Sequence, residues 1–429
     1  MDAMETTAIA VLLFVFAFGL VSRKLDALGL SPPLVFVGFG LLFSEHAFGL
    51  GPMAHTLVDP LAELTLMLVL FGDASRIDLR ALKREAGLPI RMLALGMPLT
   101  ILAGTGLALL CFPSLSLWEA GLLAAILAPT DAALGQAVVS SRVVPPAIRQ
   151  ALNVESGLND GIALPVVMVF AALAHETGGG SGTEGGSWLL FWLAQVGLGP
   201  VAGIVVALVG GRAASFVCAR GWMGETFERI AGLCLAILSY LVAQAIGGNG
   251  FIAAFVAGMV LGNSASDFAK SVHGFLETEG QLLLIAVFAL VGALWAFDTV
   301  AEANAIAWVY ALGSLTLVRI VPVALSMVGR ELRWPTALFL GWFGPRGLAS
   351  VLFALLVVER EGIPHAELIF DVAMLTVLVS VVVHGLSAQP GARTYGHWAE
   401  SLAGHEAEMQ DVLEHPTRID PSRALASRD

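Results

Sequence analysis

The chain has 429 residues, of which 57% are hydrophobic and only 13% are charged, and its formal net charge is −12. Apolar runs of this length and number exclude a soluble globular protein and predict an all-α polytopic membrane protein, whose first partner is the lipid bilayer. The acidic balance argues against a nucleic-acid partner, and the three cysteines lack metal-ligand spacing, so we expect no cofactor. The N-terminus lacks the basic region of a signal peptide, so the first apolar run is expected to stay as a transmembrane helix.

Thirteen apolar runs, bounded by glycine, proline and charged residues, are long enough to be candidate transmembrane helices. We predict them near residues 5–22, 30–45, 56–72, 88–111, 117–140, 148–174, 187–210, 226–246, 249–263, 275–297, 302–328, 334–358 and 367–387. Lys and Arg are enriched in cytoplasmic loops, so their distribution among the predicted loops tests the number of spans. With the N-terminus outside, fifteen Lys and Arg fall in inside loops and only Arg360 falls in an outside loop. The pattern therefore predicts thirteen spans and a cytoplasmic C-terminus.

The first six and the last six predicted spans can be compared around the seventh, and corresponding spans then have opposite orientations. The fifth span is interrupted at residues 128–131, and its counterpart, the twelfth, is interrupted at residues 341–347. Broken helices at matching positions of two inverted repeats indicate a transporter's binding site. Outside the spans, residues 175–187 read as a flexible linker, and residues 389–429 as a short polar cytoplasmic tail.

Several ionisable residues lie deep in these spans. At 1.5 Å per residue, Asp131, Asp160 and Arg346 each lie roughly 18–21 Å from the end of their helix, near mid-membrane. Each such group costs about 2.5–3.5 kcal/mol on insertion scales, so a functional or structural reason is expected. Glu155 and Arg319 lie nearer the cytoplasmic face at similar depth, which makes them natural ion-pair partners.

One face of the sixth span is polar. Glu155, Ser156, Asn159 and Asp160 share less than half of the helix circumference at 100° per residue. They offer carboxylate, hydroxyl and amide oxygens, which suit a small monovalent cation better than zinc or copper. Unwinding near Pro129 would free further backbone carbonyls for the same cation.

The five ionisable residues that lie deep in the predicted spans form one layer of the membrane, and their charges nearly cancel. Asp131, Glu155 and Asp160 contribute −3, and Arg319 and Arg346 contribute +2, so that one proton or one monovalent cation would neutralise the remaining −1. Desolvation favours the neutral form of a buried carboxylate, so a proton and a cation can compete for the same oxygens. Such competition is the minimal requirement for exchange.

Structural roles remain open for most of these residues. The Glu155–Arg319 pair is also common helix-to-helix architecture, and Arg346 can compensate freed carbonyls at a helix break. The side chains of Thr130, Ser156 and Asn159 could be ordinary interhelical hydrogen-bonders. Asp73 could be a boundary charge at the end of the third span. Gly258 and Gly262, spaced as G-x-x-x-G, indicate helix packing.

At these residues the chain resembles the NhaP-type monovalent cation/proton antiporters, the bacterial relatives of animal sodium/proton exchangers. The resemblance covers most of residues 5–388. Its motifs are Pro129-Thr130-Asp131, the run from Glu155 to Asp160, Arg319, and the run from Gly344 to Gly347.

The resemblance implies a thirteen-helix homodimer in the inner membrane of a bacterium, with a core that moves against a dimerisation scaffold like an elevator. We place the core spans near 56–174 and 275–388, and the scaffold spans near 5–45 and 187–263. The resemblance also implies that Asp160 carries the ion and the proton. The expected cation ligands are Asp160, Asp131, Thr130 and Ser156, with Asn159 and Asp73 as further binding residues. The Leu70–Ser75 region departs from the commoner family pattern, which has Glu there.

The sequence thus favours a secondary transporter with no catalytic residues, exchanging a monovalent cation for H⁺. Na⁺ is the leading cation, with Li⁺ and K⁺ as alternatives, and pH homeostasis is the expected role. The Asn159–Asp160 pair, in place of two aspartates, goes with electroneutral one-for-one exchange in the family that the chain resembles. Two other classes stay open: a cation channel or uniporter using the same polar layer, and an intramembrane aspartyl hydrolase built on Asp131 and Asp160.

Overall fold

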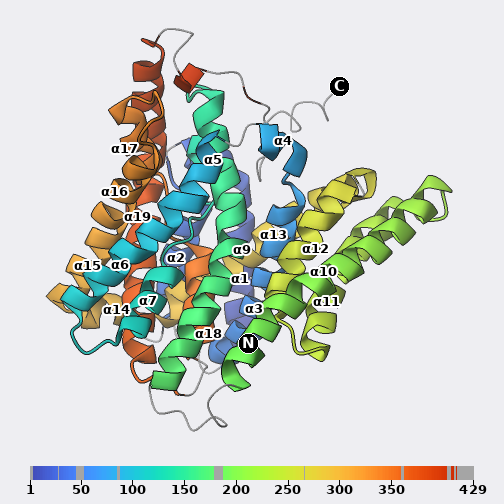
Figure 1. Cartoon of the computed structure of the whole chain (residues 1–429), viewed down its shortest axis with the longest axis horizontal. Coiled ribbons are helices and arrows are strands. Elements are labelled where there is room, and N and C mark those ends of the chain that lie inside the picture. The colour runs from blue at the N-terminus through green and yellow to red at the C-terminus, as the bar shows by residue number, and fades with distance from the viewer. Residues whose placement is uncertain are drawn as a thin grey trace.

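The computed structural model of the chain describes residues 3–27, 29–44, 53–84, 87–177, 187–264, 266–358, 362–402, 407–409 and 412. All regular elements within these ranges are helices, which pack into one bundle (Figure 1). This agrees with the all-α architecture predicted from the sequence. Most of the predicted linker at 175–187 and most of the tail beyond residue 402 lie outside the described residues.

The helices follow one another with short connections. In chain order they are α1 (Ala3–Ala27), α2 (Pro32–Leu42), α3 (Met53–Ser75), α4 (Leu79–Arg84), α5 (Gly87–Arg91), the π-helix η1 (Met92–Gly96), α6 (Met97–Cys111), α7 (Leu117–Ile126), α8 (Gln136–Val139), α9 (Pro146–Thr177), α10 (Ser187–Ala219), α11 (Glu225–Ala245), α12 (Gly250–Ser264), α13 (Ser266–Leu294), α14 (Ala296–Glu302), α15 (Ala305–Leu315), α16 (Leu317–Ser326), α17 (Trp334–Trp342), α18 (Leu348–Val358), α19 (Ala366–Ala399) and the 3₁₀-helix η2 (Ala407–Met409).

Each of the thirteen predicted ranges contains a helix or a broken pair of helices. Among the described residues, six helices are long and apolar enough on their own to cross a membrane, or seven if α13 and α14, bent by 46°, form one span. Other ranges hold shorter apolar helices, including α2, α7, α12 and α18. The number of membrane crossings therefore stays a prediction.

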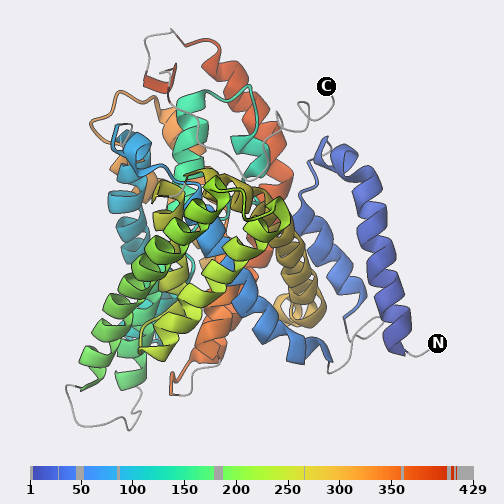
Figure 2. The ribbon, with the colours of Figure 1, turned by 90° about the vertical axis from the view of Figure 1, so that its right-hand side faces the viewer.

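One group of helices consists of α2, α3 and α10 to α13. Within it, α12 packs most extensively against α3 and α10, and α13 packs against α2 and α3. A Cβ atom at Gly258 or Gly262 would lie 2.1 or 2.0 Å from a backbone oxygen of α3, so only glycine allows this close approach. The predicted packing role of these two glycines is confirmed. The first helix, α1, lies at the edge of the molecule (Figure 2) and packs through Phe14 and Phe18 against rings of α2.

The second group consists of α5 to α9 and α15 to α19. Here α7 packs against α6 and α9, α16 against α17, and α19 against α15 and α18. Contacts between the two groups are thinner, chiefly α3 with α9 and α18, and α12 with α9. The ranges 56–72 and 275–297, which the sequence placed with the core, correspond to α3 and α13 and so pack with the first group.

The last helix is longer than predicted. We expected it to end near residue 387, but α19 continues to Ala399 even though Pro390 lies inside it. Ala388, Ala392, Tyr395 and Ala399 recur at helical spacing and are buried in a cluster with Phe339 and Phe343. Burial of this apolar stripe favours continued helix over the polar tail that the composition indicated.

Candidate functional site

The fifth and twelfth predicted spans are broken where the sequence placed the interruptions, and the two breaks lie against each other. Helix α7 ends at Ile126 and the chain is non-helical until α8, whereas α17 ends at Trp342 and α18 begins at Leu348. The backbone N–H of Asp131 donates to the carbonyl oxygen of Pro345 at 2.8 Å, which joins the breaks directly. Two half-helix ends thus meet inside the second group of helices.

Asp131 accepts backbone N–H groups from both breaks at this crossing. One carboxylate oxygen accepts from the N–H groups of Ala133, at 2.6 Å, and Leu134, at 3.4 Å. The other accepts from the N–H of Leu348, the first residue of α18, at 2.7 Å. The first N–H groups of a helix have no intrahelical partner, and a negative charge near them is favoured by the helix dipole. The structure therefore places Asp131 between the breaks, where it closes the turn that follows it and caps the N-terminus of α18.

Glycine at position 347 is a condition of this arrangement. A Cβ atom there would lie 2.1 Å from Oδ2 of Asp131. A Cβ atom at Gly344 would likewise lie 2.4 Å from Nε of Arg319. At distances below 3.0 Å the neighbouring side chain would have to shift, so the two glycines of the run from Gly344 to Gly347 leave room for an aspartate and an arginine.

Arg346 binds the opposite helix end. Its Nη1 donates to the carbonyl oxygens of Ala128, at 2.9 Å, and Pro129, at 3.2 Å, and its side chain is fully buried. These are the carbonyls freed after α7, where the helix dipole is negative. These are the contacts that a compensating role of Arg346 requires, and the role itself stays a prediction.

Three further residues, which the sequence analysis did not identify, form hydrogen bonds at or beside the two breaks. Ser350 donates to the carbonyl oxygen of Ile126 at 2.7 Å. Ser380 of α19 accepts from the backbone N–H of Arg346 at 2.7 Å, and its hydroxyl lies 3.1 Å from Nδ1 of His384. The signal for the last two was present, because Ser380 and His384 are polar residues spaced i, i+4 inside a long apolar run.

Glu155 and Arg319 form the predicted ion pair. Nη2 of Arg319 lies 2.5 Å from Oε1 and 2.8 Å from Oε2 of Glu155, and both side chains are almost completely buried. The pair joins α9 to α16. Removing either partner of such a buried ion pair alone strongly destabilises the protein, because the remaining charge is buried without its counter-ion.

The polar face of α9 meets the fifth-span break through three oxygen-bearing side chains. Asn159 Nδ2 donates to Thr130 Oγ1 at 2.6 Å, and that oxygen lies 3.0 Å from Ser156 Oγ. All three residues are buried, as is the neighbouring Asp160, which is 7% exposed. The amide oxygen of Asn159 is buried without a hydrogen-bond partner among the described residues. A buried acceptor without a partner is costly, so a cationic or hydrogen-bonding group is expected there.

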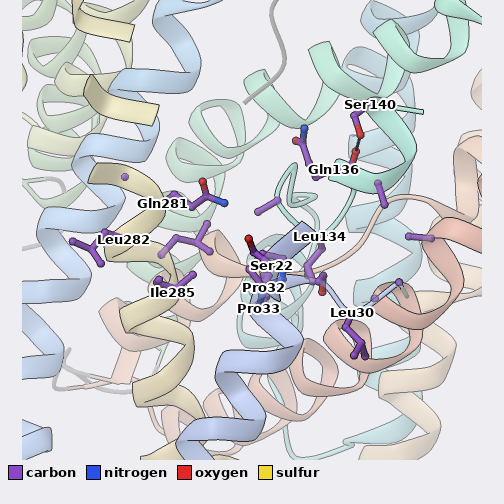
Figure 3. Close-up of a pocket in the computed structure, with 18 of the residues that line it drawn as sticks. Ser22, Leu30, Pro32, Pro33, Leu134, Gln136, Ser140, Gln281, Leu282 and Ile285 are labelled. Carbon is purple, nitrogen blue, oxygen red and sulfur yellow. Dashed lines mark hydrogen bonds between the residues drawn. The ribbon is translucent and has the colours of Figure 1, made fainter. Parts of the chain in front are cut away.

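Asp73 lies in a different part of the structure, in the wall of a cavity of about 1000 Å³. Figure 3 shows this cavity with other residues that line it, among them Leu134, Gln136 and Ile285. One side of the cavity is formed by α1, α2, α3 and α13, and the other by residues 133–143 and α19. Among the described residues, its lining includes Leu134 and Gln136 near the break, but not Thr130, Ser156, Asn159 or Asp160. The structure thus brings four of the six predicted binding residues, Asp131, Thr130, Ser156 and Asn159, into contact at the breaks. Asp160 is buried next to Asn159 on α9, and Asp73 lines the cavity between the two groups.

Asp131→Asn is expected to destabilise the protein, because Asp131 accepts N–H groups through both of its carboxylate oxygens. In Asp131→Asn a single side-chain oxygen remains, so the N–H groups on its two sides cannot all be accepted. A buried N–H left without a partner costs about 1–3 kcal/mol. We expect the melting temperature of the purified protein to fall, together with its transport activity. Equal melting temperatures of the variant and the wild-type protein would contradict the capping role.

Comparisons with known proteins agree with this arrangement. The family described as "Sodium/hydrogen exchanger, transmembrane" matches residues 9–393. The K⁺/H⁺ antiporter NhaP of Alkalimonas amylolytica is 29% identical over 406 residues, covering 92% of this chain and 67% of the relative. The K⁺/H⁺ antiporter NhaP2 of Shewanella oneidensis is 26% identical over 282 residues, covering 64% of this chain and 47% of the relative. The chain thus spans about two thirds of the length of the first relative and about half that of the second.

A solved structure shows the same fold. The sodium proton antiporter MjNhaP1 of Methanocaldococcus jannaschii superimposes with a TM-score of 0.73 at 21% sequence identity, over 92% of this chain and 100% of that one. The family match extends over most of the described helices and includes both breaks, the polar face of α9 and the Glu155–Arg319 pair. The chain therefore belongs to the sodium/hydrogen exchanger family, a family of secondary transporters and not of enzymes, and is similar to its NhaP-type members.

Proposed function

We propose that this protein exchanges a monovalent cation for a proton, with Asp160 as the group that carries either one. The buried oxygen cluster of Thr130, Ser156 and Asn159 beside Asp160 is the observation that supports this most directly. It supplies the hard oxygen ligands that a small cation prefers, next to a carboxylate that a proton can neutralise instead. Because both ligands use the same oxygens, their binding is mutually exclusive.

In this proposal Asp131 supports the site without carrying the ion. Both of its carboxylate oxygens already accept backbone N–H groups, and Glu155 is bonded to Arg319. Asp160 is the third acid of the same layer and lies beside the oxygen cluster on α9. A direct ligand role for Asp131 through its remaining lone pairs stays a prediction, as does the role of Asp73.

The cavity between the two groups of helices approaches the fifth-span break from one side of the membrane, as far as Ala133 and Leu134. It is lined by Ser22 and Ser31 near the first predicted inside loop, by Asp73 at the end of α3, and by Arg393 near the end of α19. The distribution of Lys and Arg places these ends on the cytoplasmic side, with the N-terminus outside. We therefore interpret the structure as an inward-facing state of a protein in the bacterial inner membrane.

The two groups of helices are suited to move against each other. We propose that α5–α9 and α15–α19 form the moving core, which carries Asp160 and both breaks, and that α1–α3 and α10–α13 form the scaffold of a homodimer. The contacts within each group are more extensive than those between them, and the cavity separates them on one side. This division moves α3 and α13 from the core, where the sequence placed them, to the scaffold.

The exchange is proposed to be electroneutral, one cation for one proton. Only one carboxylate stands in the Asn159–Asp160 pair, so a single positive charge neutralises it. The relatives include K⁺/H⁺ antiporters, and the similar structure is that of a sodium proton antiporter. We propose Na⁺ as the first cation to test, with K⁺ and Li⁺ as alternatives, and a role in pH homeostasis.

Proton flux in proteoliposomes tests this proposal. Na⁺, K⁺ and Li⁺ are added in turn to liposomes with an acidic interior, while an ionophore for an ion other than the one under test sets the voltage. A voltage of about 100 mV is worth about 2.3 kcal/mol for each net charge moved, so an electrogenic carrier would respond strongly. We expect cation-driven proton flux whose rate does not change with voltage. Proton or cation flux driven by voltage alone would favour a channel or uniporter instead.

The hydrolase alternative has lost its basis. It required Asp131 and Asp160 to share a proton as a catalytic pair. The carboxylate of Asp131 is instead bonded to the N–H groups of Ala133, Leu134 and Leu348, and the family is one of transporters.

A further inference from the structure

A short segment beyond the last long helix returns to the second group of helices. Helix α19 ends at Ala399, and residues 407–409 form the single turn η2 (Figure 1, red). This turn contacts α9, although the sequence around it is polar and acidic. Its central residue, Glu408, is 0% exposed. A carboxylate that is removed from water in a polar tail requires specific partners.

Glu408 finds these partners at the beginning of α17. Its Oε1 accepts from the backbone N–H of Arg333 at 2.8 Å and from the hydroxyl of Thr336 at 2.9 Å. Arg333 is the N-cap residue of α17 and its own side chain makes no capping hydrogen bond. In a capping box, a Glu three residues after the N-cap accepts the N-cap N–H, but Thr336 occupies that position here. Glu408 performs this role from a segment 75 residues away.

The same contact extends to α19. The hydroxyls of Thr336 and Tyr395 lie 3.0 Å apart, and the ring of Tyr395 stacks on that of Phe339 of α17 with centroids 4.0 Å apart. Glu408 therefore joins the ends of α17 and α19, and η2 also contacts α9. Helix α17 leads to Arg346 at the crossing of the breaks, α19 contains Ser380, and α9 contains Asp160.

We propose that Glu408 is a positioning residue for transport: the segment Ala407–Met409 clamps the ends of α17, α19 and α9, so that the core moves as one body. The clamp acts on the rate of the movement and not on the ion site, because the hydrogen bonds of Glu408 to described residues are with Arg333 and Thr336 and not with residues around Asp160. The rate part of this proposal rests on the proposed antiport, whereas the structural part does not.

Glu408→Ala, Glu408→Gln and a chain ending after Leu402 test the clamp, with Glu400→Ala as the matched control. Glu400 is on the same side of the membrane as Glu408, and its side chain is 66% exposed. Glu400→Ala removes the same charge as Glu408→Ala. We expect Glu408→Ala and the truncation to lower the maximal exchange rate by about fivefold without changing the cation concentration for half-maximal rate. Glu408→Gln retains a carbonyl oxygen that can accept both hydrogen bonds, so it should recover most of the rate.

The melting temperature gives a readout that does not depend on transport. Glu408→Ala should melt below Glu400→Ala, and Glu408→Gln should lie between Glu408→Ala and the wild-type protein. Equal melting temperatures for Glu408→Ala and Glu400→Ala would overturn the clamp, even if no cation supports exchange. A change in apparent cation affinity as large as the change in rate would overturn the positioning role, because it would place the effect at the ion site.

Discussion

Asp160→Asn is expected to abolish cation-driven proton exchange for every cation while leaving the protein folded. Asparagine has almost the same shape as aspartate, but it cannot bind a proton at physiological pH or provide a negative charge. The bound cation would lose its anionic ligand, and the proton would lose its binding site. If mutual exclusion at Asp160 drives exchange, no residual coupling should remain. Proton flux in proteoliposomes, driven by a gradient of Na⁺, K⁺ or Li⁺, measures this directly.

Two further observations separate loss of the carrier from loss of the fold. Asparagine keeps the size of the aspartate side chain and one of its oxygens, so Asp160→Asn should still be obtained as a folded, monodisperse protein. Asp298→Asn, the same substitution at an exposed position in the first turn of α14, should retain full exchange. Undiminished exchange in Asp160→Asn would assign the carrier to another acid, and Asp131 would then be the next to test.

The positions of the two helix breaks could be predicted from the sequence because their causes are local. Pro129 cannot continue a helix, and the run from Gly344 to Gly347 combines proline with two glycines inside an apolar stretch. The ion pair between Glu155 and Arg319 was also predictable, because few charges are buried in the membrane and these two lie at matching depth. Depth and periodicity are properties of single helices, so a single sequence determines them.

The roles of Asp131 and Arg346 depend on how the two breaks cross, which no local pattern contains. Asp131 and Leu348 are 217 residues apart in sequence, and their contact is visible only once both half-helices are placed. The sequence treated Asp131 as a supporting ion ligand, and that role stays a prediction; it did not show that the oxygens of Asp131 accept N–H groups of the following turn and of α18. The residual charge of −1 also stays a prediction, although Arg346 beyond the C-terminal end of α7 and Asp131 at the N-terminus of α18 lie where helix dipoles favour their charges.

Long-range packing also explains why α3 packs with α12 and why a residue of the polar tail is buried. The grouping of α3 with α12 depends on Gly258 and Gly262, which signal close packing but not the identity of the partner helix. Glu408 lies in a polar stretch that composition assigns to solvent, and only the fold brings it to the N-cap of α17. Composition predicts average exposure, so it fails for a single residue with a specific partner.

Arg319→Met is expected to give the largest loss of stability in the chain. Methionine fills much of the volume of the arginine side chain, but it leaves Glu155 as a buried charge with its ion-pair partner removed. Removing one partner of a buried ion pair costs about 3–5 kcal/mol. The fraction of folded, monodisperse protein in detergent and its melting temperature should both fall sharply, and exchange should fall in proportion to the folded protein.

The double variant Glu155→Leu/Arg319→Met decides what the pair does. Replacing both partners of a buried ion pair by apolar residues is often neutral for stability, so the double variant should melt well above Arg319→Met. If the pair is only architecture, the double variant should also exchange cations at a rate per folded protein close to that of the wild-type protein. If the folded double variant does not exchange, Glu155 or Arg319 acts on the ion itself, and the charge balance of the layer must then include both residues during transport. A double variant no more stable than Arg319→Met would show instead that the loss comes from packing around the guanidinium, beside Gly344, and not from the orphaned carboxylate.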